Sequence, residues 1–346
     1  MTQLIGTEPR SDFYAYELVA AAHKLVTEVR PVSEGQQVLI TVDSAGDSRV
    51  AYATASAVHT VGGIPVVLTY PTLPEPMGTP PKALAQAALG ADIWFDFAVS
   101  YQLYSVAFDA ALANGCIYVT LTGMDTDMMV RTIGRVPQRP LELMARRLYE
   151  LGQQARHITI TSPAGTNLRM EVDKAGDPIF DNPPTSGFPQ MLGGQSWPMA
   201  HRESFSGTLV FDGAVWPPAS LGLIREPVHL TVAEGFVPQI DGGSEARTYD
   251  KWLHSFDHPN ALMVDHACYG FNPGVTRPSG RILEDERVFG CTQFGIGATS
   301  LGSPIHTDGV VLESSVWFDD EQIEECGRYV HPEIADLCRE LGVMGY

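Results

Sequence analysis

The stretch "QQVLITVDSAGDSRVAYATASAVHTVGGIPVVLTY", residues 36–70, decides the fold of the first part of the chain. Its two ends, 36–44 and 64–70, are compact apolar runs with β-branched residues, which predict buried strands. Between them, residues 47–62 begin with an aspartate suited to the N-cap and end at a glycine, so they predict a helix. A strand, a helix and a second strand in this order predict a parallel βαβ unit.

The same alternation continues on both sides of this unit, as far as residue 135. Further helices are predicted at 12–29, 81–90 and 105–115, and further strands at 91–99 and 116–121. The loops contain no G-x-G-x-x-G and no G-x-x-x-x-G-K-[ST], so we predict neither a dinucleotide nor a nucleoside triphosphate as a ligand here. Residues 1–138 are therefore expected to form an N-terminal α/β domain with a parallel sheet.

The sequence pattern changes after residue 138. An amphipathic helix at 139–156 is expected to connect two domains. Residues 157–318 then contain short strand-like runs separated by glycine-rich turns, with one predicted helix at 243–256. Two closing helices are predicted at 320–330 and 332–341. We therefore expect a mostly β C-terminal domain at 157–346, and a chain of the α/β plus α+β class.

Composition limits the classes of partner. The 346 residues carry a formal net charge of −19, which argues against nucleic acid and against an anionic membrane as partners. The N-terminus has no signal-peptide pattern, and no apolar run reaches the roughly 18 residues of a membrane span. The five cysteines are scattered and form no C-x-x-C pair, which is typical of reduced thiols. We expect a cytoplasmic protein.

Two of the ten histidines stand out as candidate metal ligands. In "SPIHTDGVV", residues 303–311, His306 and Asp308 would share one face of a strand, because side chains two apart point the same way. The alternative is a turn at Asp308-Gly309. In "VDHACYGFNPG", residues 264–274, His266 is predicted at the exit of a strand before a glycine turn, where a rigid site is commonly built.

Together, His266, His306 and Asp308 are the ligand types of non-haem Fe(II) oxygenases, in which two imidazoles and one carboxylate leave part of the metal open. The set alone is weak evidence, since two histidines and an aspartate occur together by chance in many chains. The competing interpretation is a metal-free binding protein in which both histidines belong to the core.

Several motifs resemble the M29 metallo-aminopeptidases and their relatives. "DHACYGFNPG" (265–274), "EDERVFGCTQFGIG" (284–297) and "IHTDGVV" (305–311) follow the order of the family's C-terminal motifs. "TSPAGTNLRMEV" (161–172) and "HRESFSGTLVFDG" (201–213) are similar to its mid-chain stretches. The resemblance extends over roughly residues 35–320 and implies an M29 aminopeptidase-like fold.

The departures from the peptidase pattern indicate another chemistry. His266 stands where the peptidases carry a metal-binding glutamate, and Gln195 replaces the glutamate of their "PxGE" motif. Two-metal hydrolysis needs bridging carboxylates, so their loss favours a single metal ion. With "GFNPG" following, the chain resembles the family's branch of 2,5-dihydroxypyridine dioxygenases, which are Fe(II)-dependent, extradiol-type ring-cleaving enzymes. The alternative is an M29-like metallo-aminopeptidase or another hydrolase.

This resemblance implies a set of roles. Fe(II) would be held by His266, His306 and Asp308, and the substrates would be a hydroxylated pyridine and O₂, with N-formylmaleamate as the product of 2,5-dihydroxypyridine. His201 is the first candidate for a base or proton relay, Tyr104 for a hydrogen-bond donor, and Gln195 for substrate binding. The relatives also imply a homo-oligomer. The charge run at 284–286 is predicted to be a solvated turn.

Overall fold

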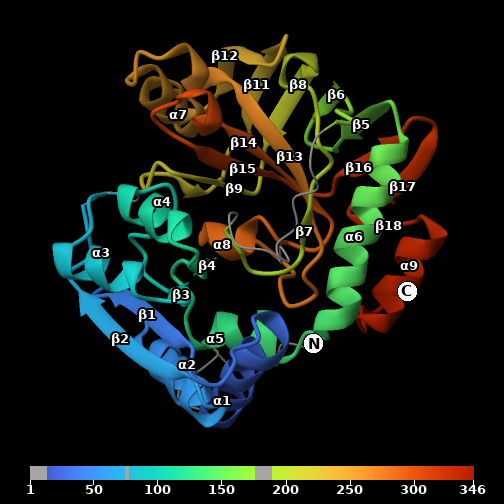
Figure 1. The fold of residues 1–346 in the computed structure, drawn as a ribbon. Coiled ribbons are helices and arrows are strands. Elements are labelled where there is room, and N and C mark those ends of the chain that lie inside the picture. Colours follow the sequence, from blue (N-terminus) through green and yellow to red (C-terminus); the bar gives the residue numbers. More distant parts are fainter. Residues whose placement is uncertain (1–13, 75–77, 176–188) are drawn as a thin grey trace. The chain divides into compact units, whose positions relative to one another are not determined.

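The computed structural model describes residues 14–74, 78–175 and 189–346. Contacts within it divide the chain into two compact units (Figure 1). Unit 1 contains the described residues through Gln138 together with 189–192, and unit 2 contains the described residues from Arg139 to 175 and from Gly193 to Tyr346. Each unit is built on its own sheets.

Unit 1 contains a four-stranded sheet in the order β2-β1-β3-β4, and every neighbouring pair is parallel. The predicted parallel α/β arrangement is therefore confirmed. Asp47 is the N-cap of the helix between the first two strands, since its side chain accepts a hydrogen bond from the backbone N of Arg49 at 3.0 Å. The strands are β1 Gln37–Asp43, β2 Ile64–Tyr70, β3 Ile93–Asp96 and β4 Ile117–Thr120. The helices are α1 Ala15–Lys24, which continues as a π-helix over Leu25–Val29, α2 Ser48–Thr60, α3 Lys82–Leu89, α4 Val106–Ala113 and α5 Thr126–Met129, which continues as a π-helix over Val130–Gly134.

The predicted connecting helix is α6, Gln138–Gln154. Within unit 2, the Ala145 carbonyl of this helix accepts a hydrogen bond from the hydroxyl of Ser196 at 2.8 Å. Arg147 forms an ion pair with Glu333 of α9, Pro332–Glu340, at 2.6 Å. Figure 1 accordingly draws α6 and α9 side by side.

Unit 2 is built on two antiparallel sheets, which agrees with the mostly β character predicted for this part of the chain. The larger sheet has the order β12-β11-β8-β6-β5-β16-β17-β18, and the smaller has the order β10-β9-β15-β14-β13-β7. The strands of the larger sheet are β5 His157–Thr161, β6 Asn167–Glu171, β8 Ser206–Phe211, β11 Val228–Ala233, β12 Phe236–Gly242, β16 Ser315–Phe318, β17 Glu321–Glu325 and β18 Arg328–Tyr329. Those of the smaller sheet are β7 Gln195–Ser196, β9 Ala214–Trp216, β10 Gly222–Leu223, β13 Val264–Gly270, β14 Cys291–Ile296 and β15 Thr307–Val311.

Besides α6 and α9, unit 2 contains the helix α7, Ser244–His254, and several shorter helical segments. These are α8 Ile282–Asp285 and the 3-10 turns Arg202–Ser204, Pro259–Leu262 and Thr299–Leu301. α7 is the helix predicted at 243–256. Among the described residues, no helix is both long and apolar enough to cross a bilayer.

The helix predicted at 320–330 is wrong, because this segment forms the strands β17 and β18. Asp319 and Cys326 both have positive φ, at 51° and 44°, and they make the tight turns that helix geometry excludes. Strand pairing with β16 also buries Glu324 completely, where its carboxylate accepts a hydrogen bond from the hydroxyl of Ser314 at 3.3 Å. Tertiary pairing therefore overrides a helix-like run of glutamates.

Candidate metal centre

One row of paired residues crosses the middle of the smaller sheet. His266 of β13 pairs with Gly295 of β14, and Gly295 pairs with Asp308 of β15. Paired residues project from the same face of a sheet, so the imidazole and the carboxylate stand on either side of a glycine. A Cβ at Gly295 would lie 2.4 Å from Cε1 of His266 and 2.7 Å from Cε1 of His306. The missing side chain therefore makes the space that the two rings occupy.

The structure differs from the sequence interpretation at two points in this row. His266 is the third residue of β13 rather than a residue at its exit. Asp308 and Gly309 both lie within β15, which removes the alternative of a turn, and His306 immediately precedes that strand. The rings of His266 and His306 stack with centroids 5.2 Å apart and planes inclined by 26°.

A β-bulge adds a second aspartate to the site. The register of β13 against β14 shifts between Val264 and His266, which leaves Asp265 as the extra residue. Its Oδ2 lies 3.3 Å from Nδ1 of His266 and 4.0 Å from Nδ1 of His306. Asp265, His266 and His306 accordingly form a group that could hold a metal ion. Asp265 was not among the predicted site residues, because a bulge follows from strand pairing and leaves no local sequence pattern.

The two nitrogens of each imidazole have different neighbours. Nδ1 of His306 lies 2.9 Å from the Gly297 carbonyl, which can only accept, so in the neutral ring the proton is on Nδ1 and the lone pair is on Nε2. That Nε2 lies 3.2 Å from Oδ1 of Asp308. His266 is arranged in the same way, with Nδ1 toward Asp265 and Nε2 3.8 Å from Oδ1 of Asp308. Both lone pairs therefore face the Asp308 carboxylate.

These donors fit a divalent cation. Ligand atoms about 2.1 Å from a metal ion stand roughly 3.0–3.4 Å apart in octahedral or tetrahedral geometry, close to the 3.2 Å and 3.8 Å found here. Burial lowers the pKa of His306, but the Asp308 carboxylate outweighs it and raises that pKa to about 10. A field that holds a proton so firmly also attracts a metal ion.

Asp265 carries charge of its own. Burial raises its pKa, but hydrogen bonding to His266 and the charges of His266, His306 and Arg202 hold it well below its usual range. Nε of Arg202 donates to Oδ1 of Asp265 at 2.8 Å. The aspartate is thus ionised and fixed between a guanidinium and a ring nitrogen, as is typical of a carboxylate that orients a metal-binding histidine.

Glu286 is a further titratable group near the site. Its Oε2 accepts hydrogen bonds from Nη1 of Arg287 at 3.0 Å and from Nε2 of Gln195 at 3.3 Å. Burial and the charge of Asp308 raise the pKa of Glu286 to about 8. Gln195, a predicted substrate-binding residue, is 2% exposed and contacts this carboxyl group directly.

The predicted solvated turn at 284–286 is therefore wrong. Glu284 and Asp285 are 1% and 0% exposed. The Ser279 hydroxyl donates to Glu284 at 2.7 Å, and the backbone N of Gly280 donates to Asp285 at 2.9 Å. These carboxylates hold the chain before α8 in place, and hydrogen bonds from a preceding turn replace the water that a charge run normally needs.

The two remaining predicted residues are His201 and Tyr104. His201 is exposed and directly precedes the turn Arg202–Ser204, and among the described residues no contact joins its imidazole to the histidine pair. Tyr104 belongs to unit 1, where it is 42% exposed, has a φ of 64° and meets the ring of Phe108 edge-on at 6.2 Å. A positive φ at a non-glycine residue is a strained backbone conformation.

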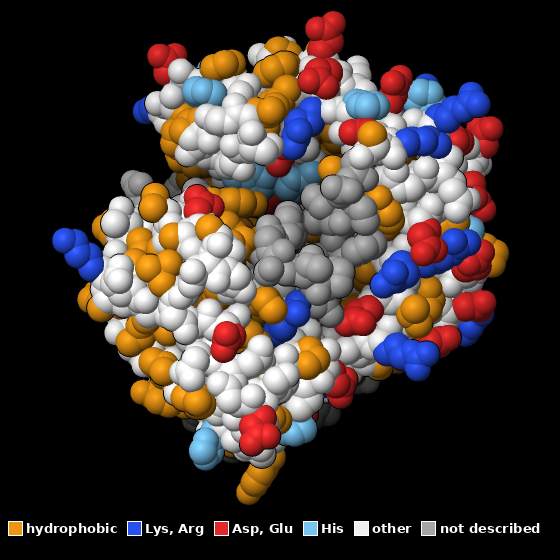
Figure 2. All heavy atoms as spheres, viewed as in Figure 1, with side chains coloured by type: hydrophobic (Ala, Val, Ile, Leu, Met, Phe, Trp, Pro, Cys, Tyr) orange, Lys and Arg blue, Asp and Glu red, His pale blue; other side chains and the backbone are white. Residues whose placement is uncertain are grey.

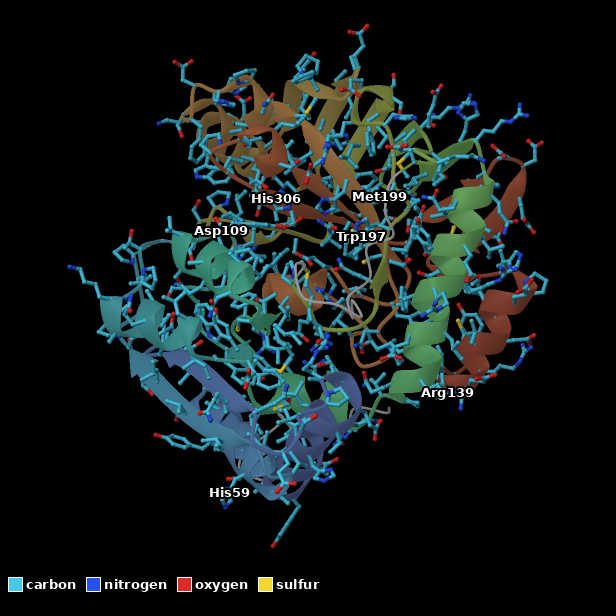
Figure 3. All side chains as sticks on the ribbon, in the orientation of Figure 1. His59, Asp109, Arg139, Trp197, Met199 and His306 are labelled. Carbon is cyan, nitrogen blue, oxygen red and sulfur yellow. The ribbon has the colours of Figure 1, made fainter. Side chains whose placement is uncertain are left out.

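The site is reachable from solvent and has an aromatic neighbour. The side chains of His266 and His306 are 27% and 13% exposed. Figure 2 shows that histidine side chains lie at several separate places on the face that it draws. The ring of Trp197 lies 6.3 Å from that of His266, inclined by 31°. Figure 3 labels Trp197 and His306.

Two sequence comparisons bear on this site. The family model described as NicX, 2,5-dihydroxypyridine 5,6-dioxygenase, matches residues 18–331. A curated 2,5-dihydroxypyridine 5,6-dioxygenase from Pseudomonas putida KT2440 is 27% identical over 205 residues, which are 52% of this chain and 56% of that relative. The match thus spans little more than half the length of the curated relative.

Solved structures share the fold. The 2,5-dihydroxypyridine dioxygenase from Pseudomonas putida KT2440 has a TM-score of 0.75 at 19% identity, over 93% of this chain and 99% of that one. Wild-type AmpT from Thermus thermophilus has a TM-score of 0.66 at 14% identity, over 92% and 100% of the two chains. The expected M29 aminopeptidase-like fold is confirmed.

Proposed function

The chain belongs to the NicX family of 2,5-dihydroxypyridine 5,6-dioxygenases, and from that membership we propose that it is an Fe(II)-dependent, ring-cleaving dioxygenase. Its substrates would be O₂ and a hydroxylated pyridine, and 2,5-dihydroxypyridine would yield N-formylmaleamate. The observation that carries this proposal is the convergence of two imidazole lone pairs and one carboxylate oxygen on one point. The donor types match the two-histidine, one-carboxylate sites of non-haem iron oxygenases.

We assign the metal ligands as Nε2 of His266, Nε2 of His306 and the carboxylate of Asp308. Asp265 is the less suitable carboxylate, because it faces the Nδ1 atoms and already pairs with Arg202. Its role would be to orient His266, as the Gly297 carbonyl orients His306. When bound, a ferrous ion would supply the redox chemistry that lets O₂ react with an aromatic ring.

Glu286 is the best-placed proton carrier. A hydroxypyridine must lose a hydroxyl proton before its ring can be attacked, and Glu286 is a buried carboxyl group whose pKa burial raises, so it can take up that proton. Gln195 and Arg287 fix one carboxyl oxygen, so Gln195 would act through Glu286 as a positioning residue.

We also propose roles for His201 and Tyr104. An exposed imidazole at His201 suits a relay that passes protons to solvent, while the phenol of Tyr104 would donate a hydrogen bond to the substrate. Replacing each by a residue without the donor, His201→Ala and Tyr104→Phe, tests them separately: a loss of kcat supports each role, and unchanged kinetics removes it.

A metallo-aminopeptidase is the second candidate, favoured by the shared fold with AmpT. Two-metal hydrolysis requires carboxylates that bridge cations about 3.5–4 Å apart. The spare carboxylates here, Asp265 and Glu286, each pair with an arginine, at 2.8 Å and 3.0 Å. That pairing leaves them poorly suited to a second cation, so the mononuclear site is preferred.

The deciding experiment compares metals and substrates on the same preparation. Protein purified without oxygen and loaded with Fe(II) should consume 2,5-dihydroxypyridine in air, whereas the Zn(II) form should not. The same samples, loaded with Zn(II) or Co(II), should leave a dipeptide panel intact. Hydrolysis of dipeptides without ring consumption would support the aminopeptidase instead.

A further inference from the structure

Gln293 lies beside two of the candidate metal ligands, His266 and Asp308. It is on β14, two residues before Gly295, and therefore on the same face of the sheet. Its side chain is 1% exposed. The carboxamide Nε2 donates a hydrogen bond to Oδ1 of Asp308 and lies 3.5 Å from Nε2 of His266. Both neighbours are atoms assigned above as metal ligands.

The orientation of this carboxamide suits only the metal-free site. An NH₂ group carries partial positive charge and has no lone pair to offer, so it cannot face a cation bound to the same Asp308 and His266 atoms. The carboxamide oxygen, Oε1, is buried and has no hydrogen-bond partner among the described residues. A half-turn about the last side-chain bond exchanges the two ends, which differ little in size.

After that half-turn, the oxygen would stand where Nε2 now stands, beside Asp308 and 3.5 Å from the lone pair of His266. Nε2 of His306 lies 3.2 Å from the same Asp308 oxygen. Three acceptor atoms would then lie around one oxygen of Asp308, an arrangement that repels itself unless a cation lies among them.

We propose that Gln293 is a fourth protein ligand of the metal, binding through its side-chain oxygen. The site would contain two neutral imidazoles, one neutral carboxamide and one carboxylate, which keeps the net charge of a divalent centre at plus one. It would leave room for two further donors instead of three. This inference rests on the metal site of the proposed function, although not on the identity of the ring substrate.

The first test measures how substitutions at Gln293 change the affinity of the protein for Co(II), by competition with a chelator and without any substrate. Gln293→Leu should weaken binding at least about tenfold, whereas Gln293→Glu should bind at least as tightly as the native protein because it supplies a second carboxylate. A Gln293→Leu protein that binds Co(II) as tightly as the native protein would overturn the assignment. Gln239→Leu, at an exposed glutamine of the same unit, is the matched control.

The second test counts imidazoles. Gln293→His should add a third imidazole to the two seen by pulsed electron paramagnetic resonance of the Cu(II)-loaded protein. Two imidazoles in Gln293→His, or native Co(II) affinity in Gln293→Leu, would overturn the assignment while leaving the three-ligand site intact. If the native protein binds neither Co(II) nor Cu(II), both this assignment and the proposed metal centre fail, which is a distinguishable result.

Discussion

Gly295→Ala is the substitution that most directly probes how the histidine pair is built. The new methyl carbon would lie 2.4 Å from Cε1 of His266 and 2.7 Å from Cε1 of His306, whereas carbon atoms in contact stay about 3.5–4.0 Å apart. Each ring must therefore retreat by roughly 1 Å. Metal–ligand distances tolerate only about 0.2 Å, so the retreat removes both Nε2 atoms from a common ion.

The expected loss of Co(II) affinity is about 100-fold or more, because it exceeds the ~10–100-fold effect of losing one outer partner of a ligand. The fold should survive, since overpacking a core position costs about 1–3 kcal/mol. Chelator competition measures the affinity, and urea denaturation of the same sample measures the stability. Gly90→Ala is the control, because a Cβ there meets only the Ala87 carbonyl, at 3.7 Å. A folded Gly295→Ala protein with native Co(II) affinity would refute this account of the site.

Three further outcomes are expected. Asp308→Asn should abolish Co(II) binding, whereas Asp265→Asn should weaken it only about 10–100-fold, and the reverse order in the same chelator titration would exchange their roles. In the Fe(II) form, Glu286→Gln should lower kcat for 2,5-dihydroxypyridine and flatten its dependence on pH more than His201→Gln does, and equal profiles for Glu286→Gln and the native enzyme would remove Glu286 from proton transfer. Burial raises the pKa of Glu324 well above its usual value. Above about pH 4.5 only the unfolded state releases this proton, so the free energy of unfolding should fall as the pH rises through that range. Glu324→Gln should therefore gain stability relative to the native protein at pH 8 but not at pH 4, and a gain that is the same at both pH values in urea denaturation would contradict this reasoning.

The sequence predicts a strand or helix correctly where the residues that determine it lie within the same short segment. The run 36–70 predicts β1, α2 and β2 because apolar runs, an N-capping Asp47 and a closing glycine are all encoded within it. The burial predicted for β2 is wrong, because this strand lies at the edge of the sheet and Ile64 and Val66 are each 46% exposed. The spacing of His306 and Asp308 likewise predicts that they converge, and their side chains meet at 3.2 Å. The segment 320–330 failed for the opposite reason, since pairing with β16 is decided by residues distant in the chain.

Most of the parts of the site that were missed depend on pairing between strands. Asp265 faces the histidines because β13 bulges against β14, and Gln293 faces Asp308 because β14 lies between β13 and β15. Gly295 matters only once both neighbouring strands are in register. Glu286 was hidden in a charge run, and only its burial distinguishes it from a solvated turn. None of these relations has a fixed spacing in the sequence.

We propose that this chain opens a hydroxypyridine ring with O₂ at the His266, His306 and Asp308 site. The most direct measurement is oxygen uptake by the Fe(II)-loaded protein on addition of 2,5-dihydroxypyridine, with His266→Ala run beside it. The account predicts one O₂ consumed per ring by the native protein and no uptake by the variant. No uptake by a native protein that demonstrably holds Fe(II), or equal uptake by His266→Ala, would contradict it.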